Sequence, residues 1–242
     1  MSIPATPSPQ TGSQLLRALE QTGARPALAW YGEAARIELS GHVLANWVIK
    51  SIGHLHDEID LAPGDEVVLD LPPHWKRLVL ALASWALGAE VTVLEREAGA
   101  PEEAAAGARE PRVMITDRPD SPLADAADEV LALDAISLAP RFSAELPPLA
   151  HDWLSEVRGS SDQLGVALPA WSGPAAEAGA AAGDDEPGQG GPTTPSRLLV
   201  DGDGLTTLPR VLDALLTGGG IVGPAAVVTE RQAQEEGVTA RL

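Results

Sequence analysis

"LAPGDEVVLDLPPHW" (61–75) contains the signals that indicate the fold of this chain. A Pro-Gly-Asp turn leads into the apolar run EVVLDL, and two prolines end that run. The next residues, 74–87, are apolar nearly all round, which is typical of a helix buried on more than one side. Gly88 ends this helix, and EVTVL (90–94) has the composition of a second strand. A strand, a helix and a strand form a βαβ unit, so the two strands are predicted to be parallel.

Similar patterns continue on both sides of this unit. Further strands are predicted at 26–31, 35–40, 112–116, 129–133 and 197–200, and further helices at 13–23, 41–58, 149–159 and 207–217. The first two strands flank a glycine turn and are predicted to form a β-hairpin, while Ser40 is a suitable N-cap for the helix that follows them. The whole pattern predicts an α/β fold with a mostly parallel sheet and helices on both of its faces.

Composition divides the chain into three parts. Residues 1–168 are expected to form the main α/β region. Residues 169–196 are rich in Gly, Pro, Ala and acidic side chains without apolar periodicity, and we interpret them as a disordered linker. Residues 197–242 read as a strand–helix–strand unit that completes the same domain.

Charge and cysteine content exclude several classes of function. The chain of 242 residues has 35 acidic against 16 basic side chains, a formal net charge of −19, so we expect neither a nucleic-acid partner nor an anionic membrane surface. It contains no cysteine, which excludes disulfides, thiolate metal sites and cysteine nucleophiles. The N-terminus lacks the basic start and apolar core of a secretory signal, so a cytoplasmic location is predicted.

A longer block around the opening stretch resembles a known superfamily. Residues 36–93, RIELSGHVLANWVIKSIGHLHDEIDLAPGDEVVLDLPPHWKRLVLALASWALGAEVTV, resemble the N-terminal part of the adenylate-forming enzymes, such as the acyl-CoA synthetases. The likeness extends over about residues 24–135, and 197–228 look like a later strand–helix–strand of the same domain. SGHVLANWVIK (40–50) and LDLPPHWKRLVLALASWALGAEVTV (69–93) also resemble a short, uncharacterised actinobacterial family that retains this N-terminal part and little else. The resemblance implies the fold; these stretches are structural rather than catalytic.

The superfamily's phosphate chemistry does not map onto this chain. Its enzymes use a Ser/Thr/Gly-rich loop closed by a lysine, an aromatic-Gly-x-Thr-Glu segment, and a second lysine on a C-terminal domain. Here the only lysines are Lys50 and Lys76, upstream of any such loop, and GQGGPTTPS (188–196) lacks the lysine and contains prolines that remove backbone donors. Thr229-Glu230 lacks the preceding aromatic-Gly, and no C-terminal domain is expected beyond Leu242. The resemblance therefore implies a non-catalytic relative, with no catalytic residues and no cofactor.

Two histidine-containing stretches remain as candidate sites. In HLHDE (54–58), His54 and His56 are two residues apart on a predicted helix and point to different faces, so we predict a solvated helix end and no metal site. His74 and Trp75 follow the carboxyl end of a predicted parallel strand, the edge at which ligands bind in open α/β sheets. They are the candidate ligand-site residues; the alternative is that His74 caps the helix and Trp75 packs against the sheet.

Three functional hypotheses follow. The first is a non-catalytic relative of the adenylate-forming enzymes that acts as a binding or interaction protein. The second is a small-molecule (nucleotide or acyl) binding protein, or a small enzyme, that uses the carboxyl edge of the sheet. The third is a structural partner whose exposed sheet edge or apolar face completes another protein's fold. The first and third predict a protein partner or a homo-oligomer.

Overall fold

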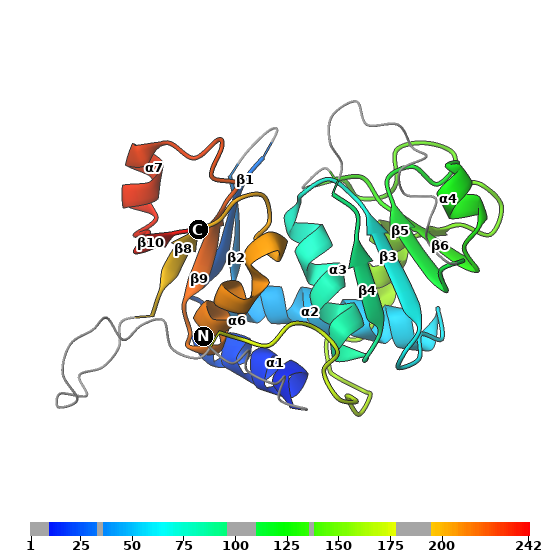
Figure 1. The fold of residues 1–242 in the computed structure, drawn as a ribbon, viewed down its shortest axis with the longest axis horizontal. Helices are drawn as coiled ribbons and strands as arrows, with labels where there is room; N and C mark the ends of the chain where they lie inside the picture. Colours follow the sequence, from blue (N-terminus) through cyan, green and yellow to red (C-terminus); the bar gives the residue numbers. More distant parts are fainter. Residues whose placement is uncertain (1–9, 33–35, 96–109, 136–137, 178–194) are drawn as a thin grey trace, which may run out of the picture. The chain divides into compact units, whose positions relative to one another are not determined.

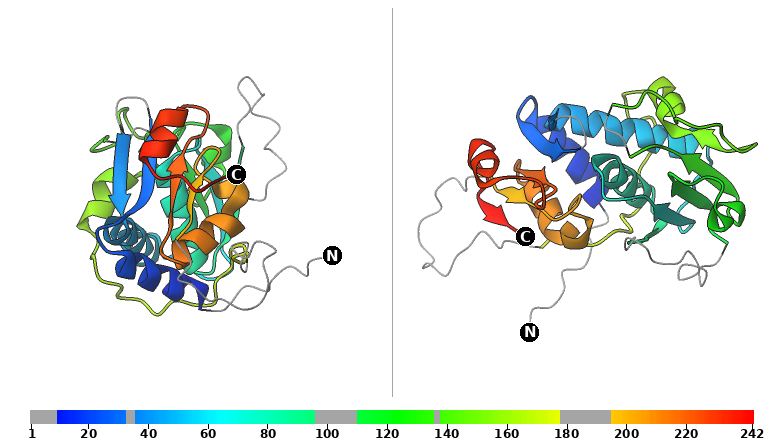
Figure 2. Two further views of the ribbon diagram at one scale, coloured as in Figure 1. Left: turned by 90° about the vertical axis from the view of Figure 1, so that its left-hand side faces the viewer. Right: turned by 90° about the horizontal axis from the view of Figure 1, so that it is seen from above.

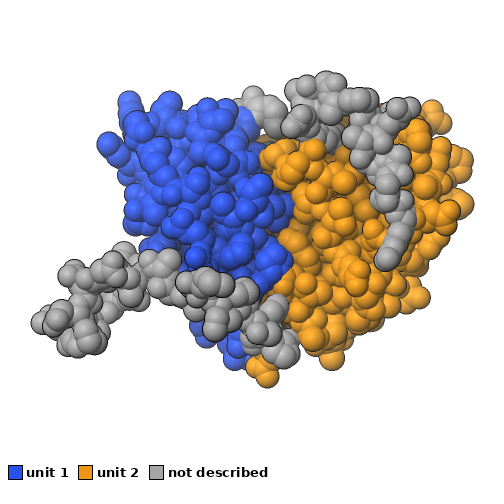
Figure 3. Space-filling model, viewed as in Figure 1, with its two compact units in different colours: residues 1–8, 14–45, 174–242 blue, residues 9–13, 46–173 orange. Residues whose placement is uncertain are grey.

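The computed structural model describes residues 10–32, 36–95, 110–135, 138–177 and 195–242. The chain forms two compact units, coloured separately in Figure 3. The first unit is built from Gln14–Ala45 and Pro174–Leu242, and the second mainly from Asn46–Gly173. Among the described residues, no helix combines the length and the apolar character that crossing a membrane requires.

The first unit contains a five-stranded sheet in the order β10-β8-β9-β1-β2 (Figure 1). β1 and β2 form the predicted antiparallel hairpin, and the other neighbouring strands are parallel. The unit's elements are α1 (Thr11–Thr22), β1 (Pro26–Tyr31), β2 (Arg36–Ser40), β8 (Arg197–Leu199), η3 (Leu205–Thr207), α6 (Leu208–Leu216), β9 (Gly220–Gly223), α7 (Glu230–Glu235) and β10 (Ala240–Arg241). The C-terminal strands thus pair with the N-terminal hairpin in one sheet.

Helices α6 and α7 cover opposite faces of this sheet, and both can be followed in Figure 2. Leu199 of β8 packs in one apolar cluster with Ala233 of α7. The preceding residue, Leu198, lines a small hollow with Asp213 and Ala214 of α6. Successive strand residues point to opposite faces, so the two helices lie on different sides.

The second unit contains a fully parallel five-stranded sheet in the order β4-β3-β5-β6-β7. The predicted βαβ unit is confirmed, because β3 and β4 are parallel neighbours joined by α3. The elements are α2 (Gly41–Asp57), β3 (Glu66–Asp70), α3 (Trp75–Ala86), β4 (Glu90–Val93), β5 (Val113–Thr116), α4 (Pro122–Asp125), β6 (Glu129–Ala132), β7 (His151–Asp152), α5 (Trp153–Glu156) and η2 (Val157–Gly159). The boundary between the two units falls within α2, and the residues of this helix from Gly41 to Ala45 belong to the first unit.

The chain changes direction within this second sheet. From β3 it passes through α3 to β4 on one side, and it then returns to place β5, β6 and β7 on the other side of β3. The space beyond the carboxyl ends of β3 and β5 is therefore a topological switch point, the place where open α/β sheets bind ligands.

The α/β class is confirmed, and the strands form two sheets where the sequence pattern indicates one. The pattern identifies strands but not their partners: Leu28 of β1 pairs with Ile221 of β9, a contact that no local signal encodes. The helix predicted at 149–159 is also interrupted. His151 and Asp152 pair with β6, and Asp152 then caps α5 by accepting from the Ser155 N–H.

The segment interpreted as a linker is described in part. Its residues 178–194, which include most of the loop-like stretch 188–196, lie outside the described residues. In the described part, Trp171 is 5% exposed and its ring lies 5.9 Å from that of Trp85. A large aromatic side chain therefore anchors the start of a stretch whose composition indicates disorder.

Candidate functional site

The carboxyl edge of the second unit's sheet carries a buried polar pair at the switch point. Asp70 ends β3 and is level with Thr116, the last residue of β5. The Asp70 carboxylate, only 2% exposed, accepts hydrogen bonds from the Thr116 hydroxyl at 3.3 Å and from the Arg118 guanidinium at 2.9 Å. Asp70 therefore holds the positively charged Arg118 side chain at the point where the chain leaves β5.

A surface hollow of about 380 Å³ adjoins this edge. Arg118, whose side chain is 43% exposed, lines it while remaining paired with Asp70. Phe142 forms part of its apolar wall, and the Phe142 N–H donates to Asp152. The other lining residues are Asp117, Pro119, Asp120, Ser121, Pro122 and Ala144. The hollow thus offers one cation, two carboxylates and an apolar wall.

His74 lies at this edge and caps α3. Its Nδ1 accepts the Lys76 backbone N–H at 3.2 Å, and only 2% of the residue is exposed. Burial, with a smaller effect of the Lys76 charge, lowers the pKa of His74 to about 3. The imidazole is therefore neutral at physiological pH, as its acceptor role requires. This geometry is the capping alternative raised from the sequence; a ligand role for His74 stays a prediction.

Trp75 is an interior residue, 3% exposed. Its ring lies 5.3 Å from that of Trp47 in an edge-on arrangement, and Trp47 in turn lies 5.9 Å from Trp153. The three indoles form an aromatic cluster that joins α2, α3 and α5 within the second unit. Trp75 packs chiefly through this cluster, and its ligand role also stays a prediction.

Both lysines of the chain are bound to backbone carbonyls. The Lys50 ammonium donates to the carbonyls of Ser160 and Arg158, and the Lys76 ammonium donates to that of Asp134 at 3.2 Å. Lys76 is 1% exposed. These ammonium groups stabilise loops of the second unit.

We expect Arg118→Ala to lower the free energy of unfolding by about 2 kcal/mol, because the buried Asp70 carboxylate loses its ion pair with the Arg118 guanidinium. Arg118 is half-exposed, so the loss should fall short of that for a fully buried pair. The double variant Arg118→Ala/Asp70→Asn should recover part of the loss, since its buried amide carries no charge. Urea unfolding measures both; equal losses in the single and double variants would contradict the charge argument.

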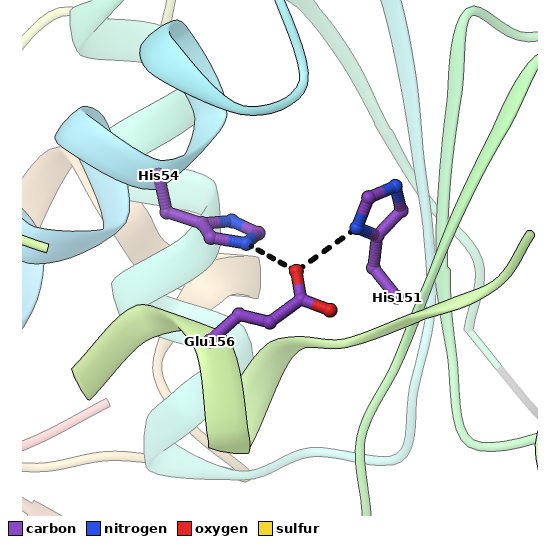
Figure 4. A group of neighbouring side chains, drawn as sticks. All are labelled: His54, His151 and Glu156. Atoms are coloured by element: carbon purple, nitrogen blue, oxygen red, sulfur yellow. Dashed lines mark hydrogen bonds and ion pairs between the residues drawn. The ribbon is translucent and has the colours of Figure 1, made fainter. Parts of the chain in front are cut away.

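A second polar cluster, formed by His54, His151 and Glu156, is shown in Figure 4. One oxygen of Glu156, Oε2, lies 2.9 Å from His54 Nε2 and 2.9 Å from His151 Nδ1. The two imidazole rings are nearly perpendicular, with centroids 6.3 Å apart. A carboxylate oxygen only accepts, so both imidazoles donate to it.

Three elements supply this cluster. His54 lies in the last turn of α2, His151 opens β7, and Glu156 ends α5. The prediction of a solvated helix end is confirmed for His56, which is exposed and bound to Asp57, and is wrong for His54, which is 1% exposed. The available signal is HDWLSE (151–156), in which a capped turn brings His151 and Glu156 together. No local sequence signal predicts that this turn contacts His54.

Hydrogen bonds from the two histidines favour the ionised form of Glu156, which accepts them. Burial acts to raise the pKa of its carboxyl group, but the hydrogen bonds from His54 and His151 outweigh that effect and lower the pKa.

A surface hollow of about 610 Å³ adjoins the cluster. Its lining residues are Gly53, Asp57, Glu58, His151, Glu156, Gly159, Ser160 and Ser161. The cluster therefore combines a buried end at His54 with a solvent-facing end.

Comparison with known proteins gives one curated relative and many solved structures. No family model matches the chain. A TIGR03089 family protein from Mycobacterium tuberculosis (strain ATCC 25618 / H37Rv) is 30% identical over 162 residues, which cover 66% of this chain and 63% of that protein. The chain therefore spans less than two thirds of the relative it matches. The match confirms that the sequence resembles that of a TIGR03089 family protein, as the resemblance to a short family predicts.

The solved structures confirm the fold. Acetoacetyl-CoA synthetase from Streptomyces lividans aligns with a TM-score of 0.63 at 19% identity, over 96% of this chain and 42% of that one. The N-terminal domain of FACL13 from Mycobacterium tuberculosis aligns with a TM-score of 0.66 at 15% identity, over 96% and 62%. The Klebsiella oxytoca NpsA N-terminal subdomain, in complex with 3-hydroxybenzoyl-AMSN, aligns with a TM-score of 0.58 at 15% identity, over 95% of this chain and 58% of that one. The chain has the fold of these N-terminal domains, as its sequence implies.

Proposed function

We propose that this chain is a non-catalytic relative of the adenylate-forming enzymes and acts as a binding or interaction protein. The observation that carries the proposal is the position of its two lysines. Activation of an acid by ATP requires an ammonium group directed at the triphosphate, whereas Lys50 and Lys76 donate to backbone carbonyls. No lysine occurs between residues 77 and 242, where the superfamily's phosphate loop would lie.

Arginine is a poor substitute for the missing lysine. A planar guanidinium has a different donor geometry from a compact ammonium at the end of a flexible stem. Arg118 is also held by the buried Asp70, which neutralises it. Arg118 at the carboxyl edge of the second unit's sheet therefore favours the binding of a ligand over the transfer of a phosphoryl or adenylyl group.

The switch-point hollow favours a small molecule as one kind of ligand. The exposed part of the Arg118 guanidinium can donate a hydrogen bond to a polar group while Phe142 contacts an apolar one, a combination that an acyl or nucleotide compound presents. A related N-terminal subdomain is described in complex with 3-hydroxybenzoyl-AMSN, so acyl-adenylate analogues belong among the probes. A protein partner is the second kind of ligand consistent with the proposal.

The purified chain should release no pyrophosphate when it is incubated with ATP, magnesium and a panel of carboxylic acids. The reason is that no ammonium group is available in this chain at the place where the superfamily grips phosphate. A coupled pyrophosphate assay, with an active acyl-CoA synthetase as positive control, measures this. Acid-dependent pyrophosphate release by the chain would refute the proposal.

Thermal unfolding in the presence of ATP, AMP, coenzyme A, the acids and an acyl-adenylate analogue separates the two kinds of ligand. A compound that binds only the folded state raises the unfolding midpoint. A shift that is lost in Arg118→Gln would place the compound at the switch-point hollow. No shift with any compound would reject the small-molecule candidate and leave a protein partner, to be sought by affinity capture.

A further inference from the structure

We propose that His54, His151 and Glu156 bind a divalent transition-metal ion, and that zinc fits this site best. The inference is independent of the proposed function, because the cluster does not include the switch-point residues. Two imidazoles and one carboxylate form a donor set that zinc accepts readily. The hard cations Mg²⁺ and Ca²⁺ prefer oxygen ligands, so the two nitrogen donors argue against them.

The ligand atoms already lie close to coordinating distance. One atom from each residue falls within 4.8 Å of the other two, and Glu156 Oε2 is 2.9 Å from each imidazole nitrogen. Zinc bonds of about 2.0–2.2 Å place neighbouring tetrahedral ligands roughly 3.3 Å apart. Each of the two O···N separations would have to widen by roughly 0.4 Å, and the two imidazole nitrogens already lie within 4.8 Å of each other. Zinc would bind the lone pairs of the two nitrogens that now donate to the carboxylate; each neutral ring would keep one proton on its other nitrogen, and any surplus proton would be released to solvent.

His54 is committed to this cluster. Its side chain is fully buried, and its Nε2 points at Glu156 (Figure 4). Its Nδ1 is buried and has no hydrogen-bond partner among the described residues. Nε2 is therefore the nitrogen of His54 that faces the other two candidate ligands, and with zinc bound there the neutral ring would carry its proton on Nδ1.

His151 has the outer support that metal-bound histidines usually have. Its Nδ1 faces Glu156, and its Nε2 lies 3.4 Å from the Glu129 carboxylate. Glu129 is itself paired with Arg112 at 3.4 Å. A carboxylate on the far ring nitrogen fixes the tautomer and strengthens the ring as a metal ligand. Glu156 is positioned in turn by the Asp152 cap of α5.

Three protein ligands leave a tetrahedral ion with one further position. Sites with three protein ligands keep that position for water or an exchangeable ligand, whereas structural zinc sites are closed by four protein ligands. His151 and Glu156 line the hollow of about 610 Å³, so a fourth ligand can enter from solvent. The geometry assigns an open zinc site whose fourth position takes water or a small anion.

Zinc titration of the purified 242-residue chain tests the proposal. After removal of metal by EDTA and dialysis, calorimetry is expected to show one zinc ion bound per chain, with a rise in the unfolding midpoint. His151→Ala and Glu156→Gln should each weaken zinc affinity at least about 100-fold, and Glu129→Gln by about 10-fold or more. The Co²⁺ form should show the intense visible absorption of tetrahedral coordination.

Matched variants control for adventitious binding to surface histidines. His56→Ala removes an exposed histidine from the same helix, and His42→Ala removes one from the first unit; both should retain wild-type affinity. Circular dichroism confirms that each variant is folded, and Glu156→Gln keeps the shape of the side chain if His151→Ala does not fold. Failure to bind one equivalent of zinc, or wild-type affinity in the His151 and Glu156 variants, would overturn the proposal.

Discussion

Replacement of Trp153 by alanine should lower the free energy of unfolding by about 4 kcal/mol, the largest effect expected for any single substitution considered for this chain. The Trp153 side chain is fully buried, and its ring lies 5.9 Å from that of Trp47. Alanine leaves a large cavity between α2 and α5, and the surrounding backbone can close it only in part. Urea unfolding followed by circular dichroism measures the loss.

Trp153→Phe separates the packing effect from polar effects. The indole Nε1 of Trp153 is buried and has no hydrogen-bond partner among the described residues. Phenylalanine removes that unpaired donor and keeps most of the ring, so this variant should lose only about 1 kcal/mol. Equal losses in the two variants would show that the shape of the indole, rather than the volume it fills, stabilises the unit.

The same substitution bears on the metal proposal. Trp153 begins α5 and Glu156 ends it, so the indole fixes the turn that presents the carboxylate to His54. Trp153→Ala leaves a cavity beneath this turn. It should therefore loosen the cluster of His54, His151 and Glu156 and weaken zinc binding more than Trp153→Phe does. The stability of the aromatic cluster and the geometry of the candidate site are thus linked through one short helix.

Local signals in the sequence account for most of the elements. The turn at 63–65, the alternation of the strands and the Ser40 cap, which accepts from the Val43 N–H at 3.2 Å, all operate over a few residues. They predict α2, β3, α3 and β4 within one or two residues of their observed ends. They do not predict that β1 pairs with β9, because that register depends on contacts between distant segments.

The candidate site shows the same division. The sequence places His74 at the start of a helix after a parallel strand, and the structure shows it there as a cap. The His54–Glu156 contact joins residues 102 positions apart, and Asp152 determines the turn that makes it possible. A short strand breaks the apolar periodicity that reads as one helix from 149 to 159, so the orientation of Glu156 could not be derived from spacing.

A final prediction concerns Glu236, which holds three strands of the first unit together. Its carboxylate accepts from Tyr31 of β1, Arg36 of β2 and Arg197 of β8, and its side chain is 6% exposed. Burial acts to raise its pKa, but these hydrogen bonds outweigh that effect and lower the pKa to about 2. The group therefore stabilises the folded state only while it is ionised.

Glu236→Gln should lower the free energy of unfolding by about 2–3 kcal/mol at pH 7. The value is set below the full linkage estimate because the Arg36 side chain is 40% exposed and solvent screens its charge. Tyr31→Phe removes one donor and leaves both arginines, so it should cost only about 1 kcal/mol. Urea unfolding of the three proteins at matched ionic strength measures the order of these losses.

The pH dependence identifies the charge as the cause. A carboxyl group whose pKa is lower in the folded state contributes fully above its unfolded value of about 4.5, and the contribution disappears as the pH falls toward the folded value of about 2. The stability difference between the wild type and Glu236→Gln should therefore be constant near neutrality and shrink between about pH 5 and pH 2. A difference that stays the same down to pH 3 would mean that the carboxylate charge does not stabilise this sheet, and that the glutamine variant loses stability through altered packing instead.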